Sequence, residues 1–340
     1  MDSRWSASLG VALLGHGLPG SAVAWARGAE RAGLGSLWII EDYFQPGAFA
    51  LAGAAAAATE RIAIGLGVVN PYTRHPALVA METAALAGLA PGRVVLGLGS
   101  SNRRWVDEQM HIPFKTPLRG LREGTALVRR LLAGERVTFA GECFAVDDVT
   151  LETPPVAPVP IVLGVKGPRA LTLAAEIADG VHCSILTSPA HVRRVRQATA
   201  GAGRAFAVLA YVPMAVSADG PAARMRVRPL LARYLGALHG QSILADAGLP
   251  APATQPFRDA LLAGRPADEL VTEAMIDTLA VAGTPAECRR ALERLAAAGL
   301  DAPVAVVPAG APLDEQLHEI GRTLAPAWTE MAARDAARRT

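Results

Sequence analysis

The chain alternates between short runs of apolar, often β-branched residues and longer stretches in which apolar positions recur at helical spacing. This alternation is typical of βα units and of a parallel sheet. Several short runs are apolar at nearly every position, as expected for strands covered on both faces. Eight strands are predicted, over Ser8–Leu14, Ser36–Ile40, Ile62–Val69, Arg93–Leu98, Pro160–Val165, Gly180–Leu186, Phe206–Pro213 and Ala302–Val307.

The longer stretches between these runs predict helices, four of which begin at a proline. Proline is tolerated in the first turn because the N–H that it lacks has no partner in the helix. The predicted helices span Ser21–Ala32, Phe49–Ala58, Pro76–Gly88, Leu118–Ala133, Pro168–Ala178, Pro189–Ala200 and Pro285–Ala298.

Two gaps between predicted strands are too long for a single βα unit. The first contains Arg136–Leu151, which has the pattern of a small hairpin, and the second contains the helical stretch Ala222–Ala282, broken by prolines. No linker-like segment divides the chain. We therefore predict one (β/α)₈ TIM barrel with insertions after strands 4 and 7, formed by residues 1–340 as a single domain. An open doubly wound sheet is the alternative, but the chain lacks the phosphate-binding fingerprint of its first turn.

Composition narrows the class of function. The chain is 51% hydrophobic and 19% charged, which excludes a disordered protein, and 33 Lys and Arg against 31 Asp and Glu give a net charge of +2, which argues against nucleic-acid binding. Three scattered cysteines indicate neither a disulfide framework nor a metal site. The N-terminal apolar run is too short for a signal sequence, and the Ala-rich run 48–58 is too short to span a bilayer. We expect a soluble, cytoplasmic protein without a membrane partner.

In a barrel of this kind the chemistry lies where strands end. Glu41 and Asp42 follow the second strand, and adjacent carboxylates suit acid–base chemistry. In the alternative reading, Glu41 caps a loop and Asp42 accepts backbone N–H groups. After the third strand, Arg74 and His75 precede a predicted helix, where His75 is either catalytic or a helix cap.

Two later strand ends suggest ligand contacts. Gly97 and Gly99 would let a ligand approach the backbone closely, although the segment is not a G-x-G-x-x-G fingerprint. After the fifth strand, Lys166, Gly167 and Arg169 surround the start of a helix, and two cations at a helix N-terminus form a candidate anion site. An ordinary βα turn is the alternative.

Taken together, five segments resemble the luciferase-like flavin monooxygenase superfamily, and within it the branch that uses the deazaflavin coenzyme F420. They match in order and spacing over nearly the whole chain, and the motifs G-V-x-N-x-Y-T-R and G-x-K-G-P-R are specific. The segments are LWIIEDYFQP (37–46), IAIGLGVVNPYTRHPALVA (62–80), GRVVLGLGSS (92–101), VPIVLGVKGPRALTLAAEIADGV (159–181) and MIDTLAVAGTPAECRRALERLAAAGL (275–300).

The resemblance implies a barrel whose cofactor ring lies at the C-terminal ends of the strands, in front of a cis peptide bond between Gly67 and Val68. It also implies a homodimer and a small-molecule substrate, for which Ser184, after the sixth strand, is a candidate contact. The implied cofactor contacts are Asp42, Gly67, Val68, Asn70, Ser100 and Ser101, with the phosphate held at Lys166, Gly167, Arg169 and Ala170.

Two positions depart from the family's pattern. The resemblance implies a His as catalytic base where this chain has Tyr43, and a Glu as acid where it has Asn102. Neither residue carries a proton readily near neutral pH, since the reference pKa of Tyr is about 10. We therefore predict an F420-dependent reductase that transfers a hydride to a C=N or activated C=C acceptor, with Tyr43 and Asn102 at its catalytic centre.

Other readings remain open at this point. One is an FMN-dependent monooxygenase on the same barrel, and another is a homologue that binds a flavin without catalysis. Tyr43 itself has a purely structural alternative, in which it packs against Phe44 or Trp38.

Overall fold

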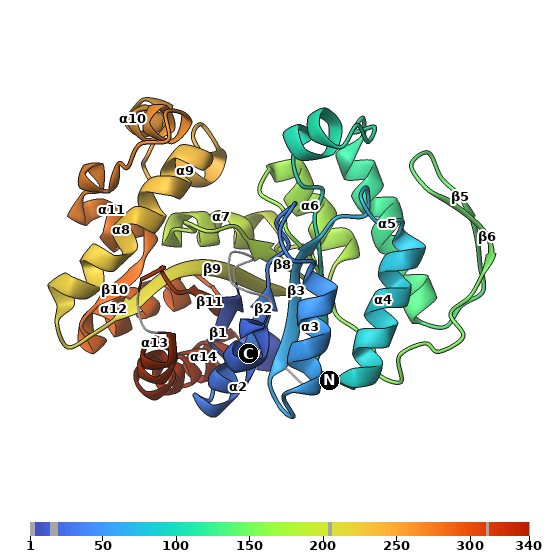
Figure 1. Cartoon of the computed structure of the whole chain (residues 1–340), viewed down its shortest axis with the longest axis horizontal. Coiled ribbons are helices and arrows are strands. Elements are labelled where there is room, and N and C mark those ends of the chain that lie inside the picture. The colour runs from blue at the N-terminus through green and yellow to red at the C-terminus, as the bar shows by residue number, and fades with distance from the viewer. Residues whose placement is uncertain (1–3, 14–19, 203–205, 311–312, 340) are drawn as a thin grey trace.

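The protein was examined as a computed structural model, which describes residues 4–13, 20–202, 206–310 and 313–339 (Figure 1). Eight parallel strands close into a barrel, because β9 pairs with β8 on one side and with β11 on the other. The predicted TIM barrel is confirmed. In order around the barrel the strands are β1 (Gly10–Leu13), β2 (Ser36–Ile39), β3 (Ala63–Val69), β4 (Val94–Leu98), β7 (Ile161–Leu163), β8 (Gly180–Cys183), β9 (Ala207–Val216) and β11 (Ala302–Val306).

The helices that follow the strands form the outer layer of the barrel (Figure 1). Each predicted helix is present within two residues of its expected bounds. Leu14, the last residue of the first predicted strand, lies outside the described residues. These helices are α2 (Ser21–Arg31), α3 (Ala48–Ala57), α4 (Pro76–Leu89), α5 (Pro117–Leu132), α6 (Pro168–Ile177), α7 (Pro189–Ala198) and α12 (Pro285–Ala297).

Both ends of the chain add helices that the sequence pattern did not predict. At the N-terminus, the one-turn helix α1 (Arg4–Ala7) brings the buried Trp5 against the barrel. At the C-terminus, α13 (Leu313–Glu319), a π-helical turn (Ile320–Leu324) and α14 (Ala325–Arg339) follow the last strand and pack beside α2 and α12. No helix in the described ranges is long and apolar enough to cross a membrane.

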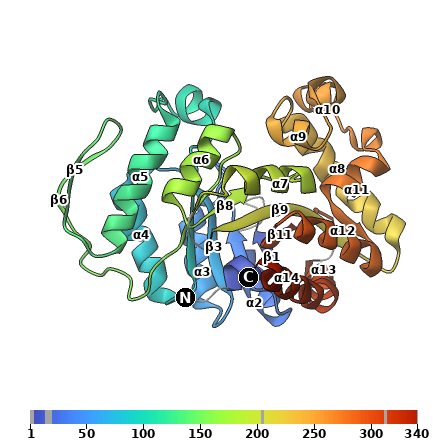
Figure 2. The same cartoon turned by 180° about the vertical axis from the view of Figure 1, so that it is seen from behind.

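The first insertion is the predicted hairpin, formed by β5 (Val137–Ala140) and β6 (Ala145–Val149), which stands at the edge of the molecule beyond α5 (Figure 2). One side chain fastens its turn to the barrel. The carboxylate of Glu123, on α5, accepts the backbone N–H groups of Glu142, Cys143 and Phe144 at 3.1, 2.8 and 3.2 Å.

The second insertion grows out of β9, which extends beyond the barrel and is longer than predicted. Its last residues, Met214–Val216, pair in parallel with a short strand, β10 (Val281–Gly283), that the sequence pattern did not predict. Between them lie α8 (Gly220–Ala237), α9 (Ser242–Asp246), α10 (Ala251–Leu262), a 3₁₀ turn (Asp268–Leu270) and α11 (Glu273–Leu279).

The barrel interior is built around Trp38, which is fully buried and donates its indole N–H to Ser36 Oγ at 3.1 Å. Gly65 is its partner in the neighbouring strand, and a Cβ there would lie 2.4 Å from the indole ring. The missing side chain therefore makes the space that the indole fills. The His182 ring packs edge-on against Trp38, with ring centroids 4.6 Å apart, and Tyr211 lies 4.0 Å beyond His182.

Candidate active site

The loop after β2 is held in place by Glu41. One carboxylate oxygen accepts from Arg74 Nη1 at 2.6 Å, and the other accepts the backbone N–H of Ala48, at the first turn of α3, at 3.3 Å. The side chain of Glu41 is 6% exposed. Glu41 therefore fixes the loop, as in its structural reading, and the acid–base chemistry considered for it has no support in this arrangement.

Asp42, the neighbouring residue, places a negative charge at the mouth of the barrel. Burial raises the pKa of Tyr211 well above its ordinary value, and the negative charge of Asp42 raises it further. The same two causes, in the same order, raise the pKa of Tyr234 on α8. Asp42 thus lies within electrostatic reach of two phenols from the other side of the barrel, which stay protonated at neutral pH and can serve as hydrogen-bond donors.

Tyr43 is half-buried between the loops that follow β2, β3 and β4. Its hydroxyl shares a hydrogen bond of 3.1 Å with Thr73 Oγ1, and its ring packs edge-on against Trp105 at 5.5 Å. Burial raises the pKa of its phenol, and hydrogen bonds from Thr73, Asn70 and Ser101 oppose that rise only in part. Tyr43 touches Phe44, with ring centroids 6.3 Å apart, whereas the aromatic neighbour of Trp38 is His182.

Asn70 organises the loop that follows β4. Its buried amide donates to the carbonyl of Ser100 at 3.2 Å and accepts the N–H of Tyr72 at 2.8 Å. Ser101, the next residue, is exposed and has a positive φ of 61°. Asn102 is also exposed, and its side-chain oxygen accepts the N–H of Trp105 at 3.1 Å, at the start of the π-helical turn Arg104–Gln109. Asn70 and Asn102 therefore hold the backbone around the two serines.

The peptide bond between Gly67 and Val68 is cis, as predicted, and the pairing of β3 with β4 shifts register there. The Val68 side chain covers three glycines of the neighbouring strand ends. A Cβ at Gly97, Gly99 or Gly164 would lie 2.9, 2.6 or 2.9 Å from its methyl carbons. The Gly67 carbonyl accepts the Tyr211 hydroxyl at 2.8 Å.

The predicted phosphate site lies at the start of α6, whose N-cap is Gly167. A Cβ on Gly167 would meet no atom within 4 Å, so the backbone there borders open space. Lys166 Nζ donates to Gln241 Oε1 at 2.8 Å, and burial lowers the pKa of this lysine. Arg169 is exposed and lines a cleft of about 450 Å³ between α5 and α6. The two cations face different neighbours, and their joint action on one phosphate stays a prediction.

The remaining candidates have mainly local contacts. His75 is the N-cap of α4, where its Nδ1 accepts the N–H of Ala77 at 3.2 Å, so its helix-cap reading holds. Ser184 follows β8 and is half-buried, and its carbonyl accepts the Thr187 hydroxyl at 2.6 Å.

A family model described as luciferase-like monooxygenase matches residues 8–302 of this chain. The chain belongs to the luciferase-like monooxygenase family. The prediction of this family from the sequence motifs is confirmed.

Two relatives of the chain are named as a reductase and a dehydrogenase. The chain is 31% identical to 5,10-methylenetetrahydromethanopterin reductase from Archaeoglobus fulgidus over 314 residues, 88% of this chain and 92% of that one. It is 37% identical to F420-dependent glucose-6-phosphate dehydrogenase from Beutenbergia cavernae over 179 residues, 49% of this chain and 53% of that one. The predicted oxidoreductase class is confirmed.

A solved structure supports the luciferase-like fold independently. The coenzyme F420 dependent tetrahydromethanopterin reductase from Methanopyrus kandleri superimposes with a TM-score of 0.86 at 24% identity, covering 95% of this chain and 99% of that one. This likeness concerns the fold.

Three polar residues of this luciferase-like barrel were not among the predicted site residues. His182 is buried, its Nδ1–H donates to the Cys183 carbonyl at 3.2 Å, and burial lowers its pKa to about 3, so the ring is neutral. Tyr211 and Gln241 complete the set. Alternation along the predicted strands could have placed His182 and Tyr211 inside the barrel. No local signal could have joined Gln241 to Lys166.

Proposed function

We propose that the protein is an F420-dependent oxidoreductase that transfers a hydride from the reduced deazaflavin to a small molecule with a C=N or activated C=C bond. Membership of the luciferase-like family supports the cofactor class, and the likeness to an F420-dependent glucose-6-phosphate dehydrogenase supports F420 in particular. When bound, F420 supplies the hydride at its C5 carbon. The protein supplies binding, orientation and electrostatics.

The state of Tyr43 is the observation that carries the choice of acceptor. Its phenol is protonated and hydrogen-bonded to Thr73, so it is a poor base for removing the proton of an alcohol. Asn102 is the second position at which this chain differs from the family's pattern, and it has an amide where the pattern has a carboxylic acid. Hydride addition to an iminium carbon moves the C=N electron pair onto nitrogen and leaves a neutral amine, so that step needs no protonated side chain. A neutral imine or an activated C=C bond takes up one proton besides the hydride, and in this proposal solvent water supplies it to the resulting nitrogen anion or enolate.

The residues at the barrel mouth fit a flavin-like cofactor with an anionic tail. The open backbone at Gly167 and the buried ammonium of Lys166 are suited to a phosphate, together with Arg169 and Ala170 in the first turn of α6. Asp42, Val68, Asn70, Ser100 and Ser101 would border the ring. In this proposal Ser184 contacts the substrate.

An FMN-dependent monooxygenase is less well supported, because the sequence relatives named above are a reductase and an F420-dependent dehydrogenase, and neither is a monooxygenase. Separate titrations with F420 and FMN test the cofactor, followed by a screen of imines and conjugated carbonyls under reduced F420. We expect saturable F420 binding and substrate reduction without oxygen uptake. Tighter binding of FMN, with oxygen consumed in turnover, would contradict the proposal.

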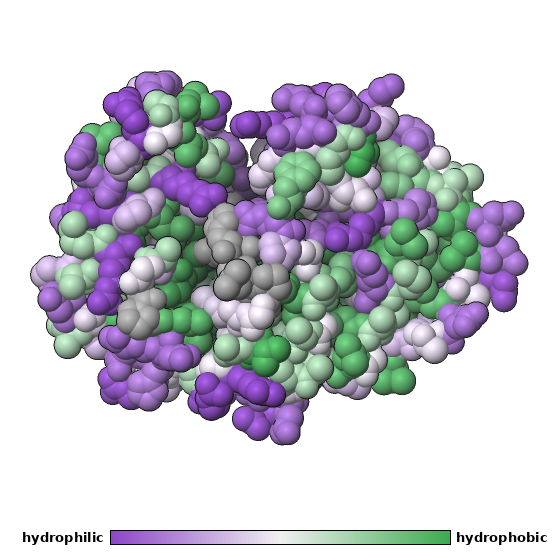
Figure 3. Space-filling view, viewed as in Figure 1, coloured by the Kyte–Doolittle hydropathy of each residue, from purple (hydrophilic) through white to green (hydrophobic). Residues whose placement is uncertain are grey.

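We also propose that two copies of the chain associate through α3 and α4. The outward stripe of α4 contains Leu78, Met81, Ala85 and Leu89, and the three large residues are 50, 51 and 56% exposed. On α3 the outward positions are alanines. Figure 3 shows apolar residues gathered over the surface where these helices lie. A surface helix of a monomer normally has a polar outer face, and a second copy would cover this apolar one.

A further inference from the structure

A second polar cavity lies outside the barrel mouth, between the N-terminal part of α7, one side of α12 and the helices of the second insertion. Its volume is about 560 Å³, which is within the range of small-molecule sites. None of the predicted cofactor contacts lines it. Its charged side chains come from five elements: Arg193 on α7, Arg224 on α8, Asp246 on α9, Asp277 on α11, and Glu287, Arg290 and Arg294 on α12.

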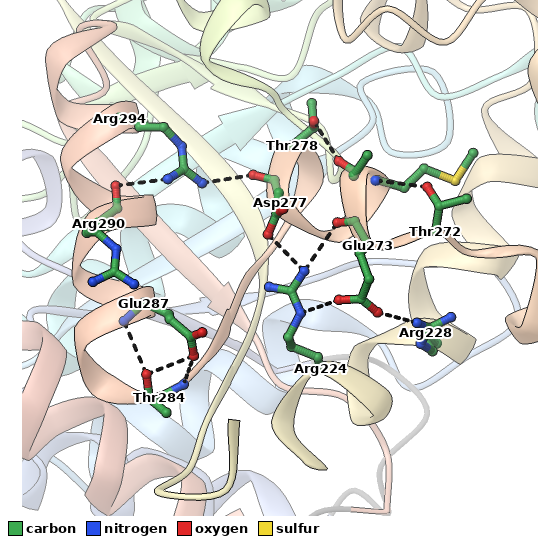
Figure 4. A network of polar contacts seen from close by, with 12 residues as sticks. Arg224, Arg228, Thr272, Glu273, Asp277, Thr278, Thr284, Glu287, Arg290 and Arg294 are labelled. Carbon is green, nitrogen blue, oxygen red and sulfur yellow. Dashed lines mark hydrogen bonds and ion pairs between the residues drawn. The ribbon is translucent and has the colours of Figure 1, made fainter. Parts of the chain in front are cut away.

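The carboxylates of this cavity are already engaged by the protein. Asp277 pairs with Arg224 at 2.8 Å, and Asp246 accepts from His191 and Arg194, both at 2.7 Å. Glu287 accepts the backbone N–H and the hydroxyl of Thr284, which lowers the pKa of its carboxyl group. Figure 4 shows the part of this network on α8, α11 and α12, in which Arg224 bridges Glu273 and Asp277.

The arginines are not engaged to the same degree. Arg294 donates to the backbone carbonyls of Arg290 and Asp277, so no carboxylate neutralises it directly. Within the described part of the chain, no hydrogen bond or ion pair joins the guanidinium group of Arg193 or Arg290 to another residue. Both arginines are exposed, and the charge of Arg290 helps to lower the pKa of the Glu287 carboxyl group. In Figure 4 the Arg290 side chain extends beside Glu287 without a contact drawn from its guanidinium.

The first turn of α7 adds a third source of positive potential. Ser188 caps it by accepting the N–H of His191, and Ala190, which lines the cavity, presents its own N–H in the same turn. Helix N-termini favour anions, and planar guanidinium groups bind carboxylate or phosphate oxygens in pairs. The cavity therefore combines a helix N-terminus with two guanidinium groups, those of Arg193 and Arg290, that no carboxylate contacts at ion-pair distance. Asp246 and Asp277 have arginine partners, and Glu287 is held by the uncharged donors of Thr284.

We propose that this cavity binds a multiply charged anion, a phosphate- or polycarboxylate-bearing small molecule, through Arg193 and Arg290. The site is separate from the proposed F420 site and does not depend on it.

Calorimetric titration of the full-length protein at low ionic strength tests the site, with pyrophosphate and citrate as the two probes. We expect saturable binding of at least one, which identifies the phosphate or the carboxylate class. The double variant Arg193→Ala, Arg290→Ala should weaken that binding at least tenfold. The control, Arg289→Ala with Arg322→Ala, removes the same charge from exposed arginines that pair with Glu330 and Glu319, and it should bind as the unmodified protein does.

Two results would overturn the proposal. One is the absence of saturable binding for both probes, and the other is an equal loss in the test and control variants, which would mean a general charge effect. The variant Lys166→Ala separates the two proposed sites. If it abolishes binding of the anion while the double variant of Arg193 and Arg290 still binds it, the probe binds at the barrel mouth and not in this cavity. Thermal unfolding of every variant confirms that it is folded.

Discussion

At the scale of single residues, packing inside this barrel depends on a large side chain, Trp38, lying opposite a glycine, Gly65. Trp38 occupies the volume that a side chain at Gly65 would otherwise need. Protein interiors are packed as densely as organic crystals, so extra atoms at such a position must displace their neighbours.

Gly65→Ala should therefore destabilise the protein by about 1–3 kcal/mol, the usual cost of overpacking a core. The reason is the Cβ, which would lie 2.4 Å from the indole. Denaturant unfolding measures the change. Gly201→Ala, at an exposed position after α7 where a Cβ meets no atom within 4 Å, is the control and should not destabilise.

Tyr43 makes the kinetic prediction of the proposed mechanism. General acid–base catalysis typically contributes about 10²–10⁴-fold to a rate. Because the proposed mechanism does not use Tyr43 as an acid or base, replacing it removes only its contribution to positioning the substrate. Tyr43→Phe should lower kcat about tenfold or less, with the acceptor found in the screen and with F420 affinity unchanged. A thousandfold fall in kcat at intact affinity would instead make Tyr43 the proton donor.

His182 makes a prediction about pH. Its folded-state pKa of about 3 lies below the ordinary value near 6.5, so between these values the unfolded chain binds more protons than the folded one. Its contribution to stability is complete above pH 6.5 and is lost as the pH falls toward 3. His182→Phe keeps the ring packing and removes this titration. The free energy of unfolding should then fall less steeply with acidification, by up to about 1.4 kcal/mol per pH unit. Equal slopes for both proteins would contradict the burial of a neutral ring.

At the scale of elements, the sequence was informative wherever one segment determines its own structure. The proline starts of α4, α6, α7 and α12 were predicted because a first-turn proline acts locally. The strand β10 was not predicted, since three residues carry no period and this strand exists only through pairing with β9. For the same reason the sequence placed Asp42, Tyr43 and Asn70 at the barrel mouth but could not join Lys166 to Gln241, which is 75 residues away.

The turn of the hairpin β5–β6 is held against α5 by Glu123. Glu123→Ala leaves three backbone N–H groups of the turn without their acceptor, at a cost of about 1–3 kcal/mol. We expect faster proteolysis and hydrogen exchange within residues 137–149 and unchanged exchange in the barrel strands. Glu142→Ala is the matched control, because this exposed side chain only pairs with Arg119, and such surface pairs contribute about 0–1 kcal/mol.

At the scale of the whole molecule, the apolar face of α3 and α4 predicts the state of association. Light scattering of the purified protein should give the mass of a dimer. Met81→Glu with Leu89→Glu should give a monomer, because two carboxylates would be buried in the contact. Met225→Glu with Leu262→Glu is the control: these residues are 61 and 67% exposed on the second insertion, and the dimer should persist. A monomeric unmodified protein would contradict the proposed interface.

The length of β9 has a consequence for how such an enzyme changes over evolution. Its first residues belong to the barrel and its last ones, Met214–Val216, to the insertion, so the chain leaves and re-enters the barrel at neighbouring points. The segment between them can therefore gain, lose or exchange helices while the eight-stranded ring keeps its register. Selection on the insertion, which reaches the barrel mouth through the hydrogen bond from Lys166 to Gln241, is thereby uncoupled from selection on the barrel itself. Grafting residues 217–280 from a relative onto this barrel is accordingly a rational route to a different acceptor preference.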